Sequence, residues 1–153
     1  MQANTEPYHK IPSISQVAEI AVEYSPATYS VTLSNEYILK SIEEFSQLEN
    51  NWDGYGAIPI SLKSSENAKQ FISTLSEELF ENFYDGFPNT HGTISFEWKN
   101  KNEEEFFVEI GDTKMSYFLT LNEQKTIKKD LVEFSPENLK TIKSYIKKWV
   151  LSY

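Results

Sequence analysis

The chain has 153 residues, the length of one ordinary domain, and 39% of them are hydrophobic, which is too many for a disordered protein. It contains no cysteine, so disulfides, thiolate metal sites and cysteine nucleophiles are excluded. The net charge is −9, and every basic residue is lysine. Without the planar fork of arginine, an acidic protein of this kind is poorly suited to nucleic acid as its main partner.

The charge is unevenly distributed along the chain. Residues 122–153 hold seven lysines and four acidic residues, a net charge of +3, whereas the first 121 residues hold seven lysines and nineteen acidic residues, a net charge of −12. The first residues lack the basic and apolar regions of a signal peptide, and no apolar run reaches the roughly 20 residues that a membrane span needs. We therefore expect a cytoplasmic protein that does not interact with membranes.

The first half of the chain predicts two helices. The sequence of residues 1–33 does not define particular helices or strands. Residues 29–33 alternate between polar and apolar side chains as a strand would, so this segment could add a strand or an arm. Apolar residues at helical spacing predict one helix from Ser34 to about Asn50. A second helix is predicted from about residues 61–64 to Phe83, and the turn-rich residues 85–92 would end it.

The second half predicts a sheet and a final helix. Three segments, 93–98, 105–110 and 115–121, alternate between apolar and polar residues and are joined by turns, which indicates an antiparallel meander. A weaker strand is predicted near residues 126–134. Ser135, Pro136 and Glu137 then mark the start of an amphipathic helix. The prediction for residues 1–153 is a single α+β domain, with a meander of three to five strands and two or three helices packed on one face.

Few residues point to catalysis. The two histidines are His9, in the first 33 residues, and His91, in a turn, and no nucleophile elbow, phosphate loop or zinc-binding helix motif is present. The acidic run 103–105 fits a solvated hairpin tip, and Asp85 and Asp112 lie beside glycines, as turn aspartates do. We therefore predict no catalytic residue, no metal site and no cofactor.

The most specific feature is a loop at residues 52–59. Tryptophan would anchor it, aspartate would accept backbone hydrogen bonds, and glycine would adopt a positive φ. The chain here resembles a widespread group of small bacterial and phage proteins of unknown function, which share a W-D-G-x-(G/x)-A-x-P loop and a downstream (I/V)-x-(L/F)-E-W strand. The matching residues, within about residues 38–120, are Trp52, Asp53, Gly54, Ala57, Pro59, Gly92, Ile94, Phe96, Glu97 and Trp98. The resemblance implies a fold and no particular activity; Trp52, Asp53 and Gly54 form either a structural turn or a binding loop.

A second candidate site is the face of the meander that points away from the predicted core. A turn centred on residues 112–113 would place Phe107 opposite Phe118 and Glu109 opposite Ser116, with Glu97 on the same face. Either another element, such as the first 33 residues, covers these phenylalanines, or they form an exposed aromatic patch among glutamates. Exposed patches of this kind mark interfaces.

These observations predict a non-enzymatic, acidic protein that binds and inhibits or escorts a protein partner with a basic surface. An antitoxin, an immunity protein or a phage anti-defence factor is of this type. Two alternatives stay open. One is a hydrolase or metal-dependent enzyme whose carboxylates, Asp53, Glu97 and Glu109, converge only in the fold. The other is an accessory subunit of a nucleic-acid-associated complex that uses the C-terminal lysines.

Overall fold

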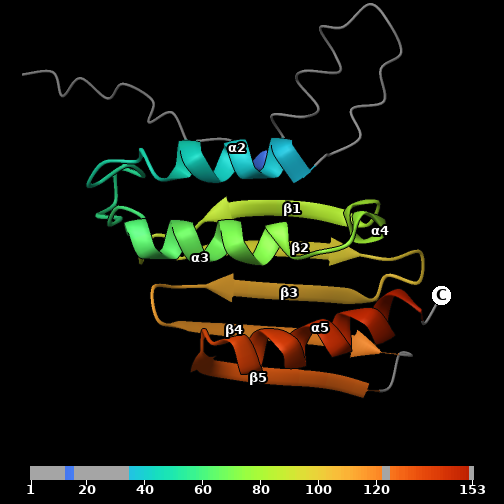
Figure 1. Ribbon diagram of the computed structural model, residues 1–153. Coiled ribbons are helices and arrows are strands. Elements are labelled where there is room, and N and C mark those ends of the chain that lie inside the picture. The colour runs from blue at the N-terminus through green and yellow to red at the C-terminus, as the bar shows by residue number, and fades with distance from the viewer. Residues whose placement is uncertain (1–12, 16–34, 122–124, 152–153) are drawn as a thin grey trace, which may run out of the picture.

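The computed structural model describes residues 13–15, 35–121 and 125–151. Within them, a five-stranded antiparallel sheet runs in the order β1-β2-β3-β4-β5, with helices on one face (Figure 1). The elements are α2 (Asn35–Phe45), α3 (Leu62–Ser73), α4 (Glu77–Phe80), β1 (Phe83–Pro88), β2 (Ile94–Lys99), β3 (Glu105–Ile110), β4 (Lys114–Leu121), β5 (Lys125–Glu133) and α5 (Pro136–Val150). The predicted α+β class and meander are confirmed, and the weak strand near residues 126–134 is β5.

The second predicted helix was wrong in its C-terminal half. Helix α3 stops at Thr74, whose hydroxyl donates to the carbonyl of Phe71, and α4 adds only one further turn. The chain then forms β1, which pairs antiparallel with β2. Phe83 fits the helical spacing of the preceding apolar residues, but in β1 its ring packs edge-on against Trp98, at 5.4 Å between ring centroids. Pairing with β2 therefore overrides the local helical pattern.

The core lies between the sheet and the helices. Alternate residues of β2, β3 and β4 point into it, and Trp98 is at its centre, stacked on Phe106 with ring centroids 4.7 Å apart. Helix α3 packs on β2 and β3, and α5 packs on β4 (Figure 1). Helix α2 packs mainly against α3. The buried core residues of the helices are Ile38, Ile42 and Phe45 in α2, Ala68, Phe71 and Ile72 in α3, Leu79 and Phe80 in α4, and Leu139, Ile142, Ile146 and Trp149 in α5.

Of the first 33 residues, the structure describes only 13–15. Ile14 is buried, and a Cβ atom added to Gly86 in β1 would lie 2.9 Å from its Cδ1 atom, so the side chain packs tightly on this strand. The strand predicted at residues 29–33 lies outside the described residues. No helix in the described part of the chain is long and apolar enough to cross a membrane.

Candidate protein-binding face of the sheet

The face of the sheet opposite the helices, here called the outer face, carries a stacked aromatic pair. Phe107 in β3 is directly opposite Phe118 in β4, and their rings stack with centroids 5.3 Å apart and planes 16° apart. Glu109 is opposite Ser116, so the predicted register is confirmed. Cross-strand aromatic pairs of this kind stabilise a sheet modestly and leave much of each ring available for other contacts.

The pair is not part of the core. Both rings are partly exposed, and neither belongs to the buried cluster or to the side chains packed against it. None of the described helices lies on this face (Figure 1). The alternative prediction is that the first 33 residues cover the phenylalanines, and all of these residues except 13–15 lie outside the described residues. The backbone N–H of Ser15 donates to Asp85 in the edge strand β1.

In the described part of the chain, the outer face has two hollows, and the larger, about 210 Å³, lies between Thr93, Glu109, Ser116 and the β3–β4 turn. The hollow between Glu97, Phe107 and Phe118 has a volume of only about 20 Å³. Binding sites for small molecules are usually clefts of roughly 300–1,000 Å³ that enclose most of the ligand. Both hollows are smaller than this range, and partly exposed aromatic side chains are enriched where proteins contact one another.

Glu97 is the carboxylate closest in register to the aromatic pair, opposite Phe107 across the β2–β3 ladder. Partial burial raises the pKa of its carboxyl group, and the neighbouring charges of Asp85 and Glu105 raise it further, while Lys99 acts in the opposite direction. Lys99 lies 3.8 Å from Glu105 and over the ring of Tyr84. Two carboxylates and one lysine therefore surround Glu97. On the other side of the aromatic pair, Lys128 of β5 is directly opposite Phe118 and lies 3.4 Å from Asp130.

Glu109 has a different environment. Its Oε1 atom lies 2.5 Å from Nε2 of His91 and accepts a hydrogen bond of 2.7 Å from the hydroxyl of Thr93. The sequence does not predict this network, because His91 lies in a turn, although Thr93 and Glu109 have the parity of the outer face. Thr93 also approaches Nε2 of His91, at 3.1 Å. A catalytic triad needs its orienting carboxylate on the other ring nitrogen, so this group lacks the geometry of an activated nucleophile.

The loop at residues 52–59 uses its polar groups internally. Oδ1 of Asp53 accepts hydrogen bonds from the backbone of Tyr55, at 2.8 Å, and of Ala57, at 3.0 Å, and these bonds hold the pKa of its carboxyl group below the usual value. The indole N–H of Trp52 donates to the carbonyl of Ile58 at 3.1 Å. Gly54 has φ +78°, as predicted. The two side-chain features and the one backbone feature predicted for this loop thus stabilise its own conformation.

The carboxylates considered for an enzyme lie in different settings. Asp53 accepts hydrogen bonds from the backbone of its own loop. Glu97 and Glu109 lie on neighbouring strands of the outer face, and Glu109 contacts Thr93 and His91. Within the described ranges, no three acidic or histidine side chains are grouped so that they could hold a metal ion.

Comparisons with protein-family models, with curated proteins and with solved structures find no match for this chain. The resemblance to the group of small bacterial and phage proteins therefore stays a prediction.

Proposed function

We propose that this protein is a non-enzymatic binding protein that inhibits or escorts a protein partner, which it contacts through the outer face of its sheet. The observation that carries this proposal is the stacked Phe107–Phe118 pair, which lies outside the core on a face that the described helices leave uncovered. Small cytoplasmic proteins of the antitoxin, immunity or phage anti-defence type act in this way.

The residues of the outer face would have different roles in binding. Phe107 and Phe118 would supply the anchors, because interface energy is concentrated in a few central residues, aromatic ones above all. Glu97, together with Asp85 and Glu105, would favour a basic partner, since complementary charge speeds the encounter and disfavours other partners. Glu109 would be less available to a partner, because His91 and Thr93 already contact its carboxylate.

The proposal is tested by capturing the partner from the native host with the full chain, purifying it and measuring the dissociation constant by calorimetry. The double substitution Phe107→Ser, Phe118→Ser should weaken binding at least about 30-fold, the equivalent of 2 kcal/mol, while circular dichroism shows a folded domain. Leu62→Ser is the matched control, because Leu62 is also an exposed apolar residue, 74% exposed, but lies on α3. Equal affinity of the double variant and the wild type would refute the proposal.

The charge of Glu97 allows a second, independent test of the proposal, by association kinetics. Glu97→Gln should slow association and reduce its dependence on salt, with little change in the dissociation rate. The nucleic-acid alternative is tested in parallel with random duplex DNA at about 0.15 M salt, where sequence-independent binding depends on the number of phosphates neutralised. Micromolar binding to that duplex would favour an accessory role in a nucleic-acid complex instead.

A further inference from the structure

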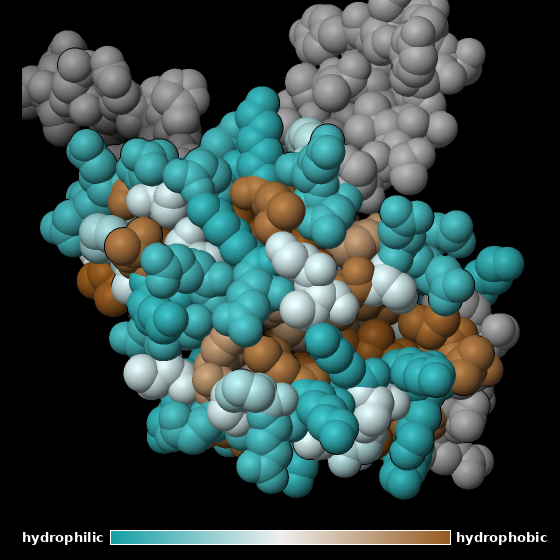
Figure 2. All heavy atoms as spheres, viewed as in Figure 1, coloured by the Kyte–Doolittle hydropathy of each residue, from teal (hydrophilic) through white to brown (hydrophobic). Residues whose placement is uncertain are grey.

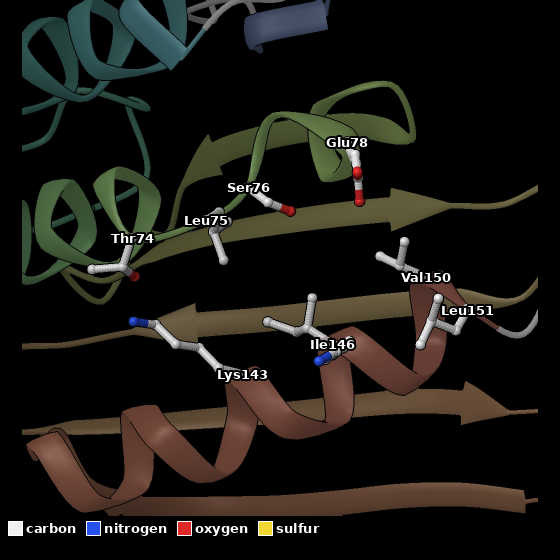
Figure 3. A pocket seen from close by; sticks show the side chains of 9 residues that line it. Thr74, Leu75, Ser76, Glu78, Lys143, Ile146, Val150 and Leu151 are labelled. Carbon is white, nitrogen blue, oxygen red and sulfur yellow. The ribbon is translucent and has the colours of Figure 1, made fainter.

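A groove lies on the other side of the molecule from the outer face, between the α3–α4 connection and the C-terminal half of α5. It has a volume of about 340 Å³. Figure 3 shows Ile146 and Val150 of α5, with Leu151 directly after the helix, lining it on one side and Leu75 on the other. In Figure 2, hydrophobic surface is exposed beside the C-terminal end of α5, bordered by hydrophilic side chains. We call this feature the α4–α5 groove.

The groove exists because α3 ends early. The chain turns at Thr74, and Ser76 starts the short α4, so no long helix packs along the end of α5. On α5, Ile142 and Trp149 point into the core, and Ile146, 6% exposed, lies between the core and the groove. The adjacent positions Lys143, Lys147 and Val150 follow the i, i+4, i+7 spacing and form a second stripe along the groove. The end of α5 therefore offers an apolar strip with lysines along it.

The charge of this strip is unbalanced. Lys143 and Lys147 are exposed, and no carboxylate in the described part of the chain lies within 4.0 Å of either ammonium group. Helix α5 carries four lysines and a single acidic residue, Glu137. On the opposite wall, Glu78 of α4 lies at the end of the groove where Val150 is, whereas the side chain of Lys143 points toward Thr74 at the other end (Figure 3). Within a chain of net charge −9, this is a local basic site with an apolar floor.

From this arrangement, we infer that the α4–α5 groove binds an acidic amphipathic segment of a protein partner. Its apolar side chains would lie on Leu75, Ile146 and Val150, and its carboxylates would pair with Lys143 and Lys147. Peptide segments commonly bind in this way, with apolar anchors in a groove and charges along its rim. Leu151 is 73% exposed and continues the apolar surface beyond the groove, as a longer segment would require. This site is separate from the outer face and has the opposite charge preference.

The test uses two fluorescein-labelled peptides, because the natural segment is not identified. One contains only leucine and glutamate with leucine at i, i+3, i+4 and i+7, and the other has lysine in place of every glutamate. We expect the acidic peptide to bind the full chain in fluorescence anisotropy and to shift the NMR signals of α4 and α5. The double substitution Lys143→Glu, Lys147→Glu should weaken binding at least about tenfold, and Glu78→Gln should strengthen it about twofold.

Matched variants make each outcome decisive. Lys140→Glu, Lys148→Glu changes the charge of α5 equally but away from the groove, so it should retain affinity within about twofold. Equal loss in both double variants would overturn the inference, because it would indicate general attraction to a basic helix. Equal binding of the lysine peptide would also overturn it. If dodecanoate alone shifted the NMR signals of α4 and α5, the occupant would be a small amphiphile and the inference would be wrong. It would also be wrong if the chain formed a dimer that only Lys143→Glu, Lys147→Glu dissociates, because the occupant would then be a second copy.

Discussion

The loop at residues 52–59 and the outer face of the sheet both combine aromatic and acidic side chains, yet they use them in opposite ways. In the loop, Asp53 accepts two backbone hydrogen bonds and Trp52 donates one. On the outer face, Phe107 and Phe118 contact each other but not the core, and Glu97 is held near other carboxylates. Side chains that bond to their own loop stabilise the fold, whereas side chains that lie outside the core remain available for a partner.

The largest expected effect on stability comes from Trp52→Ala. The indole packs against the core cluster and its N–H donates to Ile58, so its removal should lower the free energy of unfolding by about 3 kcal/mol. Urea denaturation measures this loss. The double substitution Phe107→Ser, Phe118→Ser should cost less, about 1–2 kcal/mol, because the pair lies outside the core. If the outer-face variant were instead the one that unfolds, the phenylalanines would belong to a second core layer and the comparison would be reversed.

The contrast between the two regions also explains what the sequence could predict. Alternation in β2, β3 and β4 predicted which residues face the core, and the short turn at Asp112 predicted the register of Phe107 and Phe118. These features depend on neighbours close in the sequence. The loop motif likewise predicted its internal hydrogen bonds, because Asp53 and its two donors lie within five residues of each other.

Features that depend on distant neighbours were not predictable. The local sequence of β1 predicts a helix end and a turn, and only its pairing with β2 shows that it is a strand. The α4–α5 groove requires both the early end of α3 and the approach of α5 from more than sixty residues away in the chain. His91 reaches Glu109 from a turn, where no periodic pattern indicates the direction of a side chain.

The next effect in size is expected for Gly54→Ala. Gly54 has φ +78°, which costs an L-residue with a Cβ atom about 1 kcal/mol, so the variant should unfold at a lower urea concentration than the wild type. Gly54→Asn is the control, since asparagine tolerates this conformation better and should lose less. Equal losses for alanine and asparagine would mean that the backbone angle is not the cause.

Asp53 should make the stability of the loop depend on pH. Its pKa is lowered in the folded protein by the hydrogen bonds from Tyr55 and Ala57, so its contribution is complete above the unfolded pKa of about 4 and is lost as the pH falls through the folded pKa. The difference in melting temperature between the wild type and Asp53→Ala should therefore be constant near pH 7 and shrink below about pH 4. A difference that did not change with pH would show that the charge of Asp53 plays no part.

The smallest expected effect on stability, at Glu97, has the opposite sign. Partial burial, together with Asp85 and Glu105, raises the pKa of Glu97, so the folded protein holds this proton more tightly than the unfolded chain does. The ionised carboxylate therefore costs stability above its raised pKa, and that cost disappears as the pH falls toward the ordinary value of about 4.3. At pH 7, Glu97→Gln should stabilise the domain by less than about 1 kcal/mol, because solvent screens a partly exposed group, and the gain should vanish near pH 4.

Glu109→Gln provides the comparison for Glu97, because Glu109 already accepts a hydrogen bond from Thr93 and contacts His91, so its loss should not stabilise the domain. If the outer face binds a basic partner, Glu97→Gln should weaken association under the same conditions in which it stabilises the fold. A residue retained only for structure would not show opposite effects on stability and binding. Thermal melting and stopped-flow association at pH 7 measure the two effects side by side, and a change of the same sign in both would remove Glu97 from the proposed interface.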